Sequence, residues 1–68
     1  MPTIETIGAT AGAVWKYLDA NGPASLSAIE KAVAAPKPLI PMALGWLARE
    51  GKLVIEREGR TARYAVTV

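Results

Sequence analysis

Apolar residues recur at helical spacing near the start of the chain. Thr3 or Thr6 can cap a helix here, and Gly22 followed by Pro23 supplies a stop because proline cannot continue the helix. The pattern therefore predicts a first helix over about 5–20. Its buried face would carry four residues spaced four, three and four positions apart: Ile7, Ala11, Val14 and Leu18. Trp15 would widen this face.

A second, shorter helix is predicted over about 28–34. Ser27 and Glu30 have the spacing of a capping box, in which the hydroxyl and the carboxylate each accept from a free backbone N–H. The preceding residues 24–26 are long enough only for a short edge strand. The buried side chains of this unit would be Leu26, Ile29 and Val33.

The third predicted helix begins at Pro38 or Leu39 and ends at Glu50, before Gly51. Proline suits the first turn, where a missing N–H removes no helical hydrogen bond. Pro41 fits only if the first turn is irregular. The buried stripe would consist of Ile40, Ala43, Leu44 and Leu47.

Two alternating segments rich in β-branched residues, 53–58 and 61–68, follow this helix. The turn Gly59-Arg60 joins them, so they predict a β-hairpin. Three helices, a short strand and a C-terminal two-stranded hairpin give an α+β winged helix-turn-helix fold, in which the hairpin is the wing. The chain is expected to form one such domain over 1–68.

The segment Ala43-Leu-Gly-Trp-Leu-Ala-Arg-Glu-Gly-Lys52, with Ile7-Gly8, Ala11-Gly12 and Trp15 upstream, carries a resemblance that spans nearly the whole chain. It resembles a family of small prokaryotic winged helix-turn-helix domains of unknown function, and more broadly the winged-helix regulators. The resemblance implies a winged-helix fold and a link to DNA or transcription. In the wider class, polar residues precede the Ala-Leu core of the third helix. Here those positions hold Pro38, Leu39, Pro41 and Met42.

Composition argues for binding and against catalysis. The 68 residues are 51% hydrophobic and include neither cysteine nor histidine, so disulfides, the usual zinc sites and the usual nucleophile–base pairs are lacking. Glu56 and Glu58 share one strand face, where a solvated surface is the favoured interpretation. We therefore expect no enzyme activity, no catalytic residues, no metal, no cofactor and no small-molecule substrate. A domain this small commonly gains stability from a partner subunit.

Positive charge is concentrated in the second half of the chain. Residues 1–34 have a net charge of −1, and residues 35–68 have a net charge of +3. Arg57, Arg60 and Arg63 on the wing, with Lys37 before the third helix, are candidates for contact with a nucleic-acid backbone. The alternative is that these charges keep an exposed hairpin soluble and discourage edge pairing.

The outer face of the third helix is apolar, with Pro41, Met42, Gly45 and Trp46. Such a face predicts a protein interface, since Trp and Met are enriched at contacts between proteins. Two alternatives stay open for Trp46 and Met42: packing within the domain, or apolar contact inside a DNA groove. The glycine pair Gly8 and Gly12 similarly permits close helix approach, either within the domain or across a dimer.

The resulting hypothesis is a non-enzymatic module that binds duplex DNA weakly and salt-dependently through its wing, with little sequence readout. The alternative is a protein–protein interaction or homodimerisation module that uses the outer face of the third helix. No signal sequence and no run of 18 apolar residues is evident, so we expect a cytoplasmic protein without membrane contact.

Overall fold

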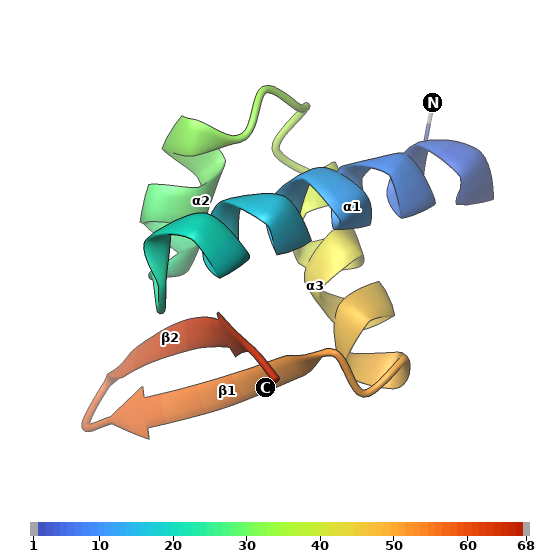
Figure 1. Ribbon diagram of the computed structural model, residues 1–68. Coiled ribbons are helices and arrows are strands. Elements are labelled where there is room, and N and C mark those ends of the chain that lie inside the picture. The colour runs from blue at the N-terminus through green and yellow to red at the C-terminus, as the bar shows by residue number, and fades with distance from the viewer. Residues whose placement is uncertain (1, 68) are drawn as a thin grey trace.

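Three helices precede a two-stranded antiparallel hairpin in the computed structural model, which describes residues 2–67 (Figure 1). This is the predicted α+β winged helix-turn-helix architecture. In sequence order the elements are α1 (Ile4–Asn21), α2 (Leu26–Ala32), α3 (Leu39–Arg49), β1 (Leu53–Glu58) and β2 (Thr61–Val66).

Both ends of α1 follow the sequence signals. The Thr3 hydroxyl accepts from the Thr6 backbone N–H at 3.1 Å, and the Thr6 hydroxyl accepts from the Thr3 N–H at 2.8 Å. This reciprocal pair makes Thr3 the N-cap. At the other end, Gly22 has a φ of 82° and donates its N–H to the Leu18 carbonyl at 2.8 Å. Only glycine adopts such a backbone conformation readily, so the predicted stop is confirmed.

The predicted capping box of α2 is wrong. Ser25, rather than Ser27, is the N-cap, and its hydroxyl accepts from the Ala28 N–H at 3.2 Å. The helix consequently begins two residues earlier than expected, and Ser27 and Glu30 lie inside it. Sequence spacing could not distinguish the two serines, since each is followed by residues that tolerate a first helical turn.

The predicted short strand is reduced to a single bridge. Ala24 donates to the Tyr64 carbonyl at 3.0 Å, and Tyr64 donates back to the Ala24 carbonyl at 2.8 Å. β2 therefore lies between this bridge and β1, with Leu53 opposite Val66 and Glu58 opposite Thr61. The strand was expected to continue to Val68; it ends at Val66, and Val68 lies outside the described residues.

The first turn of α3 is irregular, as the two prolines require. Leu39 and Ile40 donate to the carbonyls of Pro36 and Lys37 at 3.0 and 3.1 Å, which is a tighter pattern than that of a regular α-helix. Pro41 still falls within the first four residues, where no intrahelical partner for an N–H exists. The first turn thus accommodates Pro41 without the loss of a hydrogen bond.

The core lies where α1 crosses α3, and α2 and one face of the hairpin close it (Figure 1). The predicted stripes of α1 and α3 are buried here, apart from Ile7, which is half-buried. No helix in residues 2–67 combines the length and the apolar character that crossing a bilayer requires. The largest fully buried side chains are Val14, Leu18, Ile29 and Ile40.

Candidate interfaces of the wing and the third helix

The three wing arginines do not share one face of the hairpin. Arg57 lies opposite Ala62, and Arg63 lies opposite Glu56. Because adjacent residues of a strand point to opposite faces, Arg57 and Arg63 project on opposite sides of the wing. Arg60 occupies the turn between the strands, and all three side chains belong to exposed residues.

The guanidinium groups of the wing are not held by carboxylates. Within residues 2–67 the one ion pair joins Lys52 Nζ to Glu50 Oε1 at 3.8 Å, at the base of the hairpin. Arg63 makes a long hydrogen bond, 3.4 Å, to the carbonyl of Pro23. The arginines are therefore exposed cations whose interaction with an external anion would break no internal ion pair.

Lys37 is separated from the wing. It is an exposed residue of the loop between α2 and α3. Figure 1 shows that loop on the far side of α1 from the hairpin. The structure thus divides the four predicted phosphate-binding residues into a group of three on the wing and one isolated lysine.

The outer face of α3 is exposed along much of its length. Pro41 and Gly45 are exposed, and Met42 retains 44% of its accessible surface. Between this face and the wing lies a hollow of about 220 Å³, whose far wall includes Ile55 and Tyr64. Ile55 is 53% exposed, so apolar surface continues from α3 onto β1.

Trp46 is the exception among the residues predicted for this face. It is half-buried and turns towards α1, where a Cβ placed on Gly8 would lie 3.4 Å from the indole Cζ2. This is the packing within the domain that the sequence left open. Gly12 has no such neighbour within 4 Å, so the two glycines of α1 have different surroundings.

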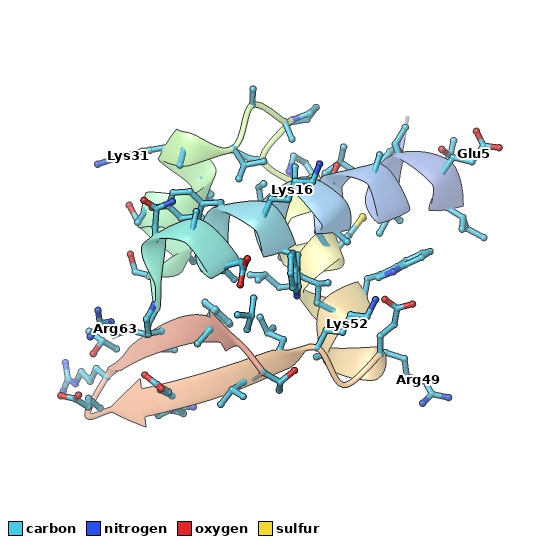
Figure 2. All side chains as sticks on the ribbon, viewed as in Figure 1. Glu5, Lys16, Lys31, Arg49, Lys52 and Arg63 are labelled. Atoms are coloured by element: carbon cyan, nitrogen blue, oxygen red, sulfur yellow. The ribbon has the colours of Figure 1, made fainter. Side chains whose placement is uncertain are left out.

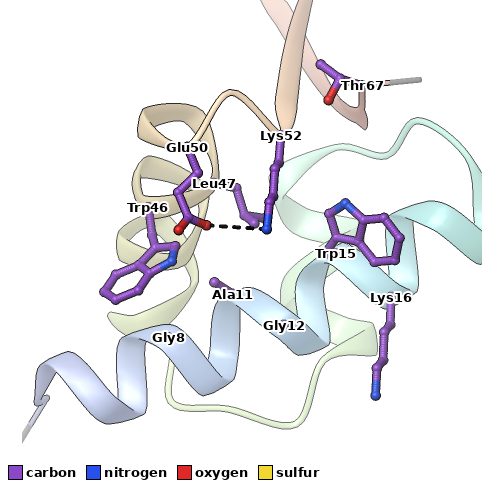
Figure 3. A pocket seen from close by; sticks show the side chains of 10 residues that line it. All are labelled: Gly8, Ala11, Gly12, Trp15, Lys16, Trp46, Leu47, Glu50, Lys52 and Thr67. Carbon is purple, nitrogen blue, oxygen red and sulfur yellow. Dashed lines mark ion pairs between the residues drawn. The ribbon is translucent and has the colours of Figure 1, made fainter.

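An open groove of about 500 Å³ runs between α1, the end of α3 and the base of the hairpin (Figure 3). We call it the tryptophan groove because Trp15 and Trp46 both line it. Gly8 and Gly12 lie along its floor, and its rim includes Lys16 and Lys52. Trp46 was predicted to lie at a protein interface, and the glycine pair to permit close helix approach within the domain or across a dimer; a groove between α1 and α3 was not predicted.

The carboxylates of the wing form no metal-binding group. Glu56 and Glu58 are both exposed and lie on one face, opposite Arg63 and Thr61. In the described part of the chain, no three Asp or Glu side chains come together in an arrangement that could hold a metal ion. The wing thus presents exposed arginines, together with carboxylates that do not cluster into a metal site.

Comparison with known proteins identifies related domains. The family model described as Winged helix-turn-helix domain (DUF2582) matches residues 1–65. The solution structure of protein BT2368 from Bacteroides thetaiotaomicron is 34% identical, with a TM-score of 0.83, over 91% of this chain and 76% of that one. No curated protein is significantly similar in sequence.

Two further solved structures share the fold. One belongs to a study of the DNA recognition and protein interaction domains of HOP2; it is 27% identical, with a TM-score of 0.71, over 85% of this chain and 98% of that one. The other is the Zalpha domain of Carassius auratus PKZ in complex with Z-DNA. It is 16% identical, with a TM-score of 0.76, over 91% of this chain and 98% of that one.

Proposed function

Since the chain belongs to the family Winged helix-turn-helix domain (DUF2582), we propose that it is a non-enzymatic module that associates with duplex DNA through its wing. The observation that carries the proposal is the set of exposed wing arginines, Arg57, Arg60 and Arg63, none of which is held in an ion pair. The similarity to HOP2, whose structure concerns DNA recognition, supports the same kind of partner.

The arrangement of the arginines suits a phosphate backbone. A DNA groove is bordered by a backbone on each side, and a hairpin lying along it would meet phosphates on both. Arg57 and Arg63 project from opposite faces of the wing, and Arg60 extends from its tip. Such contacts position a protein on DNA without specifying a sequence.

Sequence readout by α3 is not part of the proposal. Bases are distinguished mainly by side chains that make paired hydrogen bonds, such as Arg, Asn and Gln. The exposed positions at the start of α3 are Pro38, Pro41 and Met42, which offer no such groups. The arginine of this helix, Arg49, is its last residue, whereas the N-terminal part of a recognition helix normally enters the groove.

We expect binding to a mixed-sequence duplex to weaken steeply with salt. For three phosphate contacts, the affinity should fall about 40-fold between 50 and 200 mM NaCl, because each contact contributes about −0.9 to the slope of log K against log salt. Fluorescence anisotropy at several salt concentrations measures this slope. Changing Arg60 to Gln should reduce its magnitude by about one.

Lys31→Gln is the matched control for the wing variants. Lys31 is an exposed cation on α2 and points away from the hairpin (Figure 2). Its removal changes the net charge by the same amount and should leave the slope unaltered. Lys37→Gln tests the isolated lysine separately. Absence of binding by the wild type at 50 mM salt, or an unchanged slope after removal of all three arginines, would contradict the proposal.

A second candidate function is self-association through the outer face of α3. The observation that favours it is the apolar surface that extends from Pro41 and Gly45 across the hollow to Ile55, with the exposed Met42 next to Pro41 on α3. Contiguous exposed apolar surface commonly marks a protein interface. Trp46 would contribute its exposed edge, while its remaining surface packs on α1.

Sedimentation equilibrium at micromolar concentration tests self-association. We expect the wild type to form dimers and Met42→Lys to shift the population towards monomers, because the change places a charge on the apolar face. Ile4→Lys is the control, since Ile4 is 75% exposed and lies in the first turn of α1. A wild-type monomer over this range, or dimers that Met42→Lys leaves intact, would rule out this interface.

A further inference from the structure

We propose that the free edge of β1 binds an extended segment of a partner protein, which would add a strand to the hairpin. The hairpin is a two-stranded sheet in the order β1-β2, and Ala24 bridges β2 on the side away from β1. The edge formed by β1 pairs with no other strand within residues 2–67 (Figure 1). An unpaired strand edge presents N–H and C=O groups that form a template for another strand.

The hydrogen bonds of β2 show which groups of β1 point to this free edge. Tyr64 exchanges both of its backbone hydrogen bonds with Ala24, so its N–H and C=O point away from β1. Ile55 lies opposite Tyr64 and therefore forms a non-hydrogen-bonded pair with it. The N–H and C=O of Ile55, and those of Arg57 two residues later, consequently point outwards. Both residues are exposed, so a partner strand can reach these four groups.

The same stretch of β1 offers an apolar contact on one face. Ile55 is 53% exposed and lines the hollow of about 220 Å³ between α3 and the wing, together with the exposed residues Gly45 and Ala48. Directly opposed residues of neighbouring strands lie on the same face of a sheet and contact each other. An apolar side chain opposite Ile55 would therefore cover this surface. In strand addition, main-chain hydrogen bonds supply affinity and side-chain contacts supply specificity.

The other face of β1 carries two exposed carboxylates, Glu56 and Glu58. Arg63 lies opposite Glu56, but neither carboxylate forms an ion pair within residues 2–67. Opposite charges on directly opposed residues of neighbouring strands stabilise a sheet, and like charges destabilise it. The complementary partner is therefore a strand with basic residues opposite the two glutamates and an apolar residue opposite Ile55.

Charge disfavours a second copy of β1 as the occupant. A symmetric antiparallel pair that uses the outward groups of both Ile55 and Arg57 places Ile55 of each copy opposite Arg57 of the other. That register also places Glu56 opposite Glu56 of the second copy, in the closer, non-hydrogen-bonded kind of pair. A register centred on Ile55 avoids this repulsion, but it pairs Arg57 with Leu53, which is only 9% exposed.

The peptide acetyl-Thr-Lys-Thr-Lys-Val-Thr-amide is a suitable probe. In an antiparallel pairing its lysines lie opposite Glu58 and Glu56, and its valine lies opposite Ile55. The full chain, labelled with nitrogen-15, is titrated with the peptide while amide resonances and hydrogen exchange are followed. We expect the amide resonances of Ile55 and Arg57 to shift saturably, with a dissociation constant on the order of 1 mM. Hydrogen exchange at these two amides should slow about fivefold or more at saturation, because each N–H gains an acceptor.

Reversing the charges tests the predicted chemistry of the partner. A peptide with glutamate in place of both lysines should bind about tenfold more weakly, because two attractive pairs become repulsive. The double variant Glu56→Lys, Glu58→Lys should reverse this preference. Both substitutions are on an exposed strand face, so we expect the domain to fold.

A proline substitution tests the backbone contact separately. Arg57→Pro removes an outward N–H without removing a hydrogen bond to β2, as proline on an edge strand allows. It also removes a positive charge, which alone would favour the basic peptide. An expected loss of affinity of about fivefold or more is therefore attributable to the backbone. Ala62→Pro is the matched control, because Ala62 lies opposite Arg57 and its N–H points to the other edge of the hairpin. Its affinity should equal that of the wild type.

Several results would overturn the proposal. They are the absence of a saturable shift at Ile55 and Arg57, equal binding of the two peptides by the wild type, and equal losses in Arg57→Pro and Ala62→Pro. The comparison of the two peptides does not depend on how the proline variants fold. Slowed exchange at these amides that depends on protein concentration without any peptide would also overturn it, because a second copy would then occupy the edge.

Discussion

Changing Ile40 to alanine is expected to lower the free energy of unfolding by about 2–5 kcal/mol. Ile40 is fully buried, at 0% exposure, although it is only the second residue of α3. Its side chain belongs to the same buried cluster as Val14 and Ile29, so truncation would leave a cavity where three helices meet. Small domains have total stabilities of about 5–15 kcal/mol, so the loss would be a large fraction of the whole.

Urea denaturation followed by circular dichroism measures this change. Ile55→Ala is the matched control, because it removes the same atoms from a side chain that is 53% exposed. Its effect should stay below about 1 kcal/mol, since little apolar surface returns to water. Similar losses in the two variants would mean that the start of α3 does not contribute to the core as described.

The second large effect is expected at Gly22, which we would change to alanine. Its φ of 82° and ψ of −169° fall in a region that essentially only glycine occupies. No atom lies within 4 Å of its Cβ position, so side-chain clashes play no part. The penalty, about 1–3 kcal/mol, would come from backbone strain alone.

Changing Gly12 to alanine provides a control, because it should change the free energy of unfolding in the opposite direction. Gly12 is in the interior of α1, without a positive φ and with open space around its Cβ position. Alanine there should raise the free energy of unfolding by about 0.5–1 kcal/mol. Thermal unfolding of both variants in parallel tests the pair. A neutral result for Gly22→Ala would show that the connection between α1 and α2 can take another path.

The helices and the hairpin were predictable because their signals are local. The apolar steps of α1 depend only on the 3.6-residue period, and Ala11, Val14 and Leu18 are all buried as expected. The alternation of residues 53–58 and 61–66 similarly depends on the two-residue period of a strand. The order of these helices and strands along the chain is then compatible with only a few folds.

Features that depend on residues far apart in the sequence were not predictable. The bridge between Ala24 and Tyr64 joins the connection between α1 and α2 to β2, which lies far along the chain. The tryptophan groove likewise depends on the position along α1 at which α3 crosses it. This position places Trp46 over Gly8 and leaves Gly12 uncovered. Local patterns indicated that the glycines permit close approach, without indicating what approaches each one.

The candidate phosphate-binding residues illustrate the same limit. The sequence identified the basic half of the chain, but strand register decides that Arg57 and Arg63 lie on opposite faces. The fold also carries Lys37 away from the wing, because the loop between α2 and α3 lies across α1 from the hairpin (Figure 1). The positions of these four residues relative to one another were therefore not predictable from local patterns.

The bridge between Ala24 and Tyr64 fixes one side of the wing to the connection between α1 and α2, through two hydrogen bonds of 3.0 and 2.8 Å. A hairpin held in this way has lost much of its conformational freedom before it meets a partner. Its arginines would then bind with a smaller entropic penalty than those of a flexible loop, because preorganised surfaces lose less freedom on association. The bridge would thus lower the entropic penalty of the proposed contact between the wing and DNA.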